Sequence, residues 1–111
     1  MENPFKFGTI VEEEYYLSER LKAVFPLNYN GLSNSILDYT GCHPYYSQQL
    51  AANVWQVGVM QPNVHDPMGA AIDHIVKSHG LDYERFWMKF NSDQYEIEDP
   101  FFKQWMLDEM Q

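Results

Sequence analysis

The side chains with the most obvious capacity for chemistry in this sequence are four histidines and one cysteine, which are His43, His65, His74, His79 and Cys42. A zinc site needs several such ligands around one point, and two ligands on one helix lie three or four residues apart so that they share a face. His74 and His79 are five residues apart and point to different faces. We interpret the histidines as surface residues and predict no metal site.

Cys42 and His43 are a nucleophile and a base in adjacent positions. Neighbouring residues rarely aim their side chains at each other, and no third group in the sequence is placed to orient the imidazole. A single cysteine also forms no internal disulfide. The acidic runs at residues 12–14 and 96–99 are typical of solvated faces or helix starts. We therefore predict no catalytic residue.

The elements on either side of Cys42 are predicted to be helices. Apolar residues recur at helical spacing over residues 32–39 and 44–59. Gly41 stands where a helix-ending left-handed residue is expected, and Pro44 suits the first turn of the next helix. The sequence therefore predicts a tight corner between two helices, with Cys42 and His43 at its tip.

Similar patterns place the remaining elements. They are, in chain order, an extended start, a helix over residues 12–24, a helix begun by Asp66-Pro67 and closed by Gly80, a helix capped by Asp82, a short strand at 95–97, and a helix after Asp99-Pro100. The predicted fold is all-α: a bundle of four or five short helices with an extended N-terminal segment and at most a short strand. We expect one compact domain, divided into an N-terminal segment (1–28) and a helical domain (29–111).

Charge and hydropathy restrict the partners. Sixteen acids against seven bases give a formal charge of −9, which disfavours nucleic acid and anionic membranes. No apolar stretch approaches the roughly 20 residues of a membrane-spanning helix, and the first residues do not resemble a signal peptide. We expect a cytoplasmic protein.

Aromatic residues make up 16% of the sequence, and several gather near its C-terminal end. The candidate interaction face consists of Phe86, Trp87, Phe90, Phe101, Phe102 and Trp105. Such a stripe at helical spacing usually belongs to a core, but an exposed patch of this kind usually marks association. Both interpretations remain open from sequence, and self-association is the main expectation.

Several stretches resemble parts of one protein family. Residues 3–8 and 14–20 resemble the opening of prokaryotic AAA-type ATPases of the archaeal-ATPase, STAND-related group. Residues 36–46, which include Thr40-Gly41-Cys42-His43-Pro44-Tyr45-Tyr46, resemble the motif of the helical lid in those proteins. Residues 83–87 look like the last lid helix, and residues 95–105 resemble the end of the winged-helix domain that follows.

The phosphate-binding loop of that family has no counterpart here. Such a loop needs Gly-x-x-x-x-Gly-Lys-Ser/Thr, because backbone N–H groups hold the phosphates while Lys and Ser/Thr serve phosphate and Mg²⁺. No Gly-Lys pair occurs in the sequence. The chain thus resembles a lid without its nucleotide-hydrolysing domain.

The resemblance implies one ligand site. In the related ATPases a Gly-x-Pro element of the lid packs against adenine, and Cys42, His43 and Pro44 occupy its positions here, with Phe5 in the N-terminal opening. Cys42 stands where the family has Gly, which weakens the match, and a plain helix-to-helix corner is the competing interpretation.

We expect from these features a non-catalytic helical interaction domain derived from an ATPase lid, with no cofactor, which self-associates or binds a larger relative. The alternative is a weak sensor of ATP or ADP without hydrolysis. A small enzyme with an unrecognised site is the third possibility.

Overall fold

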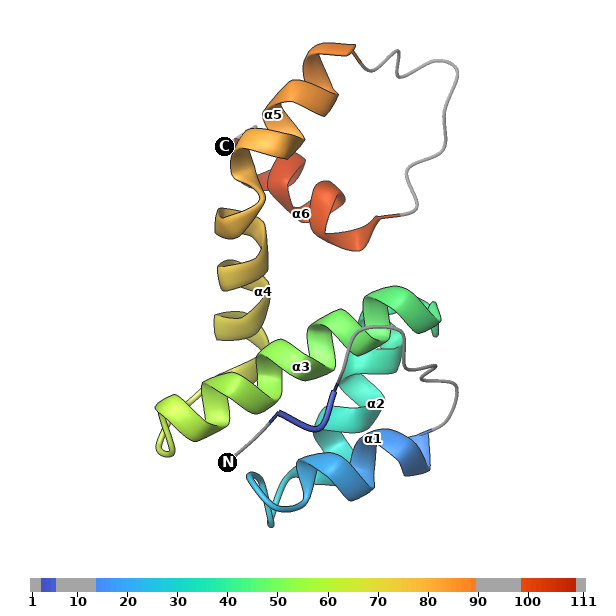
Figure 1. Ribbon diagram of the computed structural model, residues 1–111, viewed down its shortest axis with the longest axis vertical. Coiled ribbons are helices and arrows are strands. Elements are labelled where there is room, and N and C mark those ends of the chain that lie inside the picture. The colour runs from blue at the N-terminus through green and yellow to red at the C-terminus, as the bar shows by residue number, and fades with distance from the viewer. Residues whose placement is uncertain (1–2, 6–13, 90–98, 110–111) are drawn as a thin grey trace.

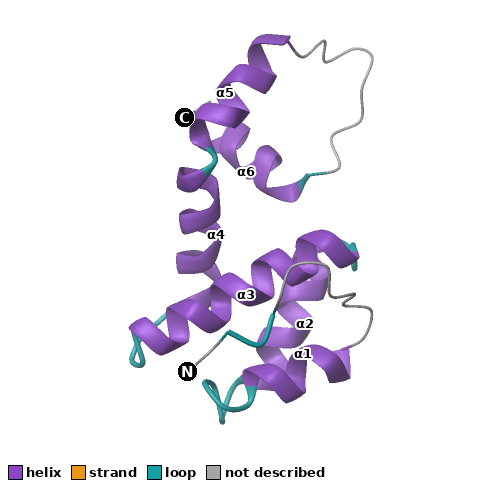
Figure 2. Ribbon diagram, viewed as in Figure 1, coloured by secondary structure: helices purple, strands orange, loops and turns teal. Residues whose placement is uncertain are grey.

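The computed structural model describes residues 3–5, 14–89 and 99–109. These residues form six helices and contain no strand, so the all-α prediction is confirmed (Figures 1 and 2). The helices are α1 (Glu14–Leu21), α2 (Tyr29–Thr40), α3 (Pro44–Met60), α4 (Pro67–Ser78), α5 (Gly80–Lys89) and α6 (Pro100–Glu109). The predicted strand at 95–97 lies outside the described residues.

The helices are arranged in two groups along an elongated molecule of 43 × 27 × 22 Å. Helices α1, α2 and α3 pack together in one half, and α4 leads from the end of α3 to the other half, where α5 and α6 lie (Figure 1). One apolar core runs through the molecule. Representative fully buried side chains from five helices are Leu17, Ile36, Trp55, Ile75 and Phe101.

Close packing between α3 and the segment after α1 depends on a glycine. A β-carbon on Gly58 would overlap the side chains of Val24 and Phe25. Gly58 therefore allows the segment after α1 to approach α3 more closely than any larger residue would.

The predicted helix starts at two aspartates are confirmed. The carboxylate of Asp66 accepts a hydrogen bond from Gly69 N at 3.0 Å. The carboxylate of Asp99 accepts hydrogen bonds from the first turn of α6, at 2.8 Å from Phe101 N and 3.2 Å from Phe102 N. Each aspartate thus satisfies N–H groups that have no partner inside the helix.

The predicted boundary between α4 and α5 is wrong. Gly80 does not close α4; α4 ends at Ser78 and Gly80 is the first residue of α5. Asp82 is not a cap either, because it lies in the first turn of α5, where Tyr83 N already donates to His79 O at 2.9 Å. The two helices follow each other almost directly, so a glycine and an aspartate that are typical of helix ends lie inside the junction.

Two other boundaries differ from the prediction. Helix α1 ends at Leu21, although residues 12–24 were predicted to be helical, and α2 starts at Tyr29 rather than at residue 32. The N–H groups of Val24 and Phe25 still donate to Leu21 O, which makes this link a tight turn. The break that Pro26, Asn28 and Asn30 indicate is therefore shorter than predicted, because α2 already begins at Tyr29.

Candidate functional site

The corner between α2 and α3 has the left-handed backbone that the sequence predicts at Gly41, and the following residue, Cys42, is left-handed as well. Gly41 has a φ of 63° and Cys42 a φ of 62°. Cys42 N donates to Leu37 O at 2.9 Å, and Gly41 N donates to Asp38 O at 3.4 Å. These bonds satisfy carbonyl groups at the end of α2. Cys42 carries a side chain in a conformation that favours glycine, so its backbone is strained.

A buried pair of hydroxyl groups, on Thr40 and Ser47, stabilises the corner. The Thr40 hydroxyl donates to Ile36 O at 2.9 Å and lies 2.6 Å from the Ser47 hydroxyl. Because the single Thr40 proton is used on Ile36, the Ser47 hydroxyl is the donor in the second bond. This bond joins the last turn of α2 to the first turn of α3, and both side chains are buried.

Aromatic side chains connect the corner to α6. The His43 ring lies 4.5 Å from the Tyr46 ring, and Tyr46 in turn lies 6.1 Å from Phe101. Tyr39 approaches Phe101 from α2 at 5.9 Å, and its hydroxyl donates to Pro100 O at 3.4 Å. Burial raises the pKa of the Tyr39 phenol, and the negative charge of Asp99 raises it further. The start of α6 is therefore packed onto the same helices that form the corner.

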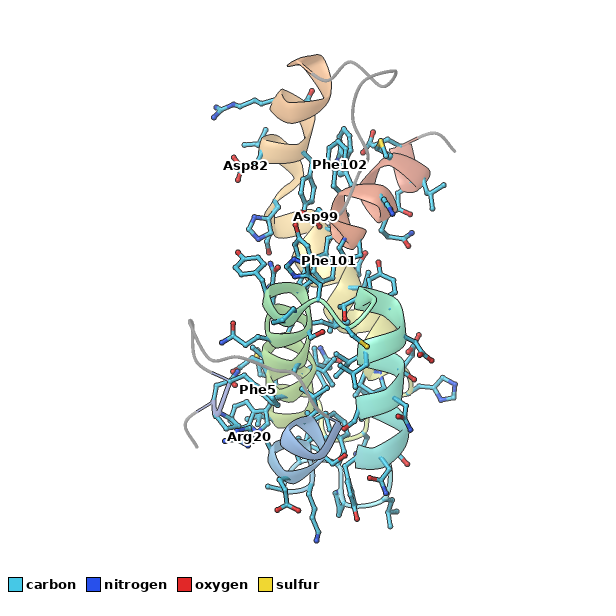
Figure 3. All side chains as sticks on the ribbon, turned by 90° about the vertical axis from the view of Figure 1, so that its right-hand side faces the viewer. Phe5, Arg20, Asp82, Asp99, Phe101 and Phe102 are labelled. Atoms are coloured by element: carbon cyan, nitrogen blue, oxygen red, sulfur yellow. The ribbon has the colours of Figure 1, made fainter. Side chains whose placement is uncertain are left out.

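The structure brings together only some of the residues of the adenine-side site. Cys42, His43 and Pro44 are exposed together at the corner. Phe5 is buried and does not reach it: Asn3 Nδ2 donates to Ala52 O at 2.9 Å, which ties this segment to α3 about 12 Å beyond Pro44. Figure 3 shows Phe5 well separated from Phe101 along the long axis. Phe5 is a core residue here, not a partner of the corner.

The predicted interaction face is divided between core and surface. Phe101 and Phe102 are 0% and 3% exposed, so they belong to the core of this chain and offer no surface to a partner. Phe102 packs on Tyr83 at 5.5 Å and stacks on Trp105 at 5.8 Å. Trp105 is half-buried. Phe86 and Trp87 belong to α5, but their side chains lie outside the description, as does Phe90 altogether.

A groove opens where the α4–α5 junction faces the C-terminal half of α6. Its volume is about 610 Å³, and Leu81, Trp105 and Met106 supply its apolar walls. Leu81 is 71% exposed, so most of its side chain is open to solvent at this groove. Lys77, Glu84 and Glu109 provide its charged lining.

Leu81 and Met106 were missed as site residues from the sequence. Leu81 follows Gly80, which was interpreted as the end of a helix, and a leucine there gives no surface signal. The partial signal is Trp105, which belongs to the predicted interaction face and lines the groove. Finding the groove requires the packing of α6 against α4 and α5, which comes from distant parts of the chain.

The described residues contain no group of three or more His, Cys, Asp or Glu side chains arranged to hold a metal ion. No helix in the described part of the chain is both long and apolar enough to cross a membrane. His79 lies 3.9 Å from the Asp82 carboxylate at the α4–α5 junction, and Cys42 is an exposed free thiol.

Comparison of the chain with protein-family models, with curated protein sequences and with solved structures gives no match.

Proposed function

We propose that this chain is a non-catalytic interaction domain that binds a protein through the groove between the α4–α5 junction and α6. The observation that carries the proposal is the groove itself, which exposed Leu81 lines together with Trp105 and Met106. Water-exposed apolar side chains of this kind gain free energy when a partner covers them. The origin of the domain in an ATPase lid rests on the resemblance of residues 36–46 and remains part of the proposal.

The proposed occupant is either a second copy of the chain or another protein, such as a larger relative with a complete phosphate loop. A cytoplasmic location and the exclusion of nucleic acid belong to the same proposal. They are supported by the single cysteine and by the formal charge of −9.

Nuclear magnetic resonance of the ¹⁵N-labelled protein tests this function. The spectrum is followed over a concentration series and in titrations with synthetic amphipathic helical peptides that share one leucine face but carry Lys, Gln or Glu on the other. Shifts confined to the amides around Leu81, Glu84 and Met106 would support the proposal. A chain that stays monomeric by light scattering and whose groove amides respond to none of the peptides would refute it.

A second candidate function is weak sensing of ATP or ADP at the α2–α3 corner. Its support is that Cys42, His43 and Pro44 are exposed together beside the ring of Tyr45, which is 52% exposed. Aromatic and imidazole rings can stack on a purine. Without a loop that holds phosphate, the affinity is expected to be millimolar at best. Flat amide shifts at Gly41 and His43 in millimolar ATP would exclude this function.

A further inference from the structure

The groove has its own acidic side chains, in addition to the negative formal charge of the whole chain. Glu84 and Glu109 line it, and among the described residues the one lining cation, Lys77, is paired with Asp73 at 2.9 Å. Arg85 and Lys103 are exposed on α5 and α6, but neither belongs to the lining. As far as the chain is described, the groove therefore combines apolar walls with two acidic side chains that Lys77, already paired with Asp73, does not balance.

The C-terminal end of α6 strengthens this negative potential. Glu109, the last residue of α6, lines the groove, and the C-terminal end of a helix carries partial negative charge. The last turn of α6 contains Asp108 and Glu109 and no basic residue. Carboxylates at this end of a helix are unfavourable in the isolated chain, and a cation brought there by a partner would relieve the repulsion.

These charges distinguish between the occupants. If two copies docked groove to groove, Glu84 and Glu109 of one copy would lie against the same residues of the other and repel them. The dimer would also carry a formal charge of −18, twice the −9 of one chain. A basic partner meets no such repulsion. A groove between helices whose apolar walls are Leu, Trp and Met also matches the way in which an amphipathic helix lays its apolar face into a partner.

We propose that the groove binds a basic amphipathic helix of another protein, whose apolar face covers Leu81, Trp105 and Met106 and whose Lys or Arg side chains reach Glu84 and Glu109. This inference rests on the proposed function and adds the chemistry of the partner to it.

The test compares the affinities of the three peptides described above, together with a scrambled Lys peptide that lacks an apolar face. Trp fluorescence and the amide shifts report binding to the complete chain. The Lys peptide should bind about tenfold more tightly than the Glu peptide, and this difference should shrink in high salt. The scrambled peptide should not bind.

Charge-neutralising variants locate the effect. The double variant Glu84→Gln/Glu109→Gln should weaken the Lys peptide by about fivefold and leave the Gln peptide unchanged. The matched control is Glu19→Gln/Asp38→Asn, which removes the same charge from exposed positions on α1 and α2. This control should bind the Lys peptide as the unmodified chain does. Thermal unfolding of both variants verifies that the fold is kept.

Each alternative result has a defined meaning. If the Gln peptide binds as tightly as the Lys peptide, the groove is an interaction site but its partner is not basic. If the control pair weakens binding as much as the groove pair, the attraction is non-specific and the inference fails. A concentration-dependent dimer with shifts at Leu81 would assign the groove to a second copy, and the absence of any binding would remove the proposed function as well.

Discussion

Replacing Cys42 with glycine is expected to stabilise the protein, because this residue has a φ of 62° at an exposed corner. An L-residue in the left-handed region costs about 1–2 kcal/mol relative to glycine. Glycine raises the entropy of the unfolded chain and gives back about 0.5–1 kcal/mol of that gain. The exposed thiol contributes little packing. The expected net gain in the free energy of unfolding is about 0.5–1 kcal/mol.

Two matched variants separate the backbone from the side chain. Cys42→Ala removes the thiol but keeps the strain, so it should leave stability within about 0.5 kcal/mol. Ser35→Gly introduces glycine at an exposed position inside α2, where the backbone is helical, and should destabilise by about 0.5 kcal/mol.

Thermal and urea unfolding measure the difference. A gain of this size corresponds to a rise in Tm of about 2–6 °C for a domain of this length. If Cys42→Gly lowers Tm as Ser35→Gly does, Cys42 does not adopt the left-handed conformation and the reasoning about the corner is wrong.

Three further changes test the packing of the helices. Gly58→Ala should destabilise by about 1–3 kcal/mol in urea unfolding, because the added β-carbon would overlap Val24 and Phe25. Gly31 has open space around it, so Gly31→Ala should be neutral or stabilising, and equal effects of the two variants would contradict the packing. Asp99→Ala should cost about 0.5–2 kcal/mol through the lost cap of α6, and Asp99→Asn should recover most of it; a loss that Asn does not reduce would argue against capping. Burial raises the pKa of the Tyr83 phenol, so the folded state holds this proton more tightly than the unfolded state does, and the free energy of unfolding should fall as pH rises above about 10. Tyr83→Phe should reduce this alkaline loss of stability, and an unchanged dependence of stability on pH would refute the assignment.

The features that were predicted well from the sequence are local ones. Gly41, Asp66 and Asp99 act within one turn of the helix that they end or begin, so their roles follow from residue type and position. The same local rules failed at Gly80 and Asp82. There α5 begins at Gly80 itself, and Tyr83 in its first turns is buried against Phe102, which comes from α6.

The parts that were not predicted depend on contacts between distant residues. The sequence of an aromatic stripe does not determine which of its side chains are buried. Only the packing of α6 shows that Phe101 is buried while Trp105 lines a groove. In the same way, the bond between Asn3 and Ala52 carries Phe5 into the core, although the resemblance placed it beside Cys42. The groove arises from three helices together, so Trp105 alone does not reveal it from the sequence.

The most direct measurement is an isotope-filtered nuclear Overhauser experiment on the labelled protein with the unlabelled Lys peptide. We predict contacts between the leucine face of the peptide and the side chains of Leu81 and Met106. Contacts that instead involve Tyr45 at the α2–α3 corner, or none at all with a peptide that binds, would contradict the assignment of the groove as the binding site.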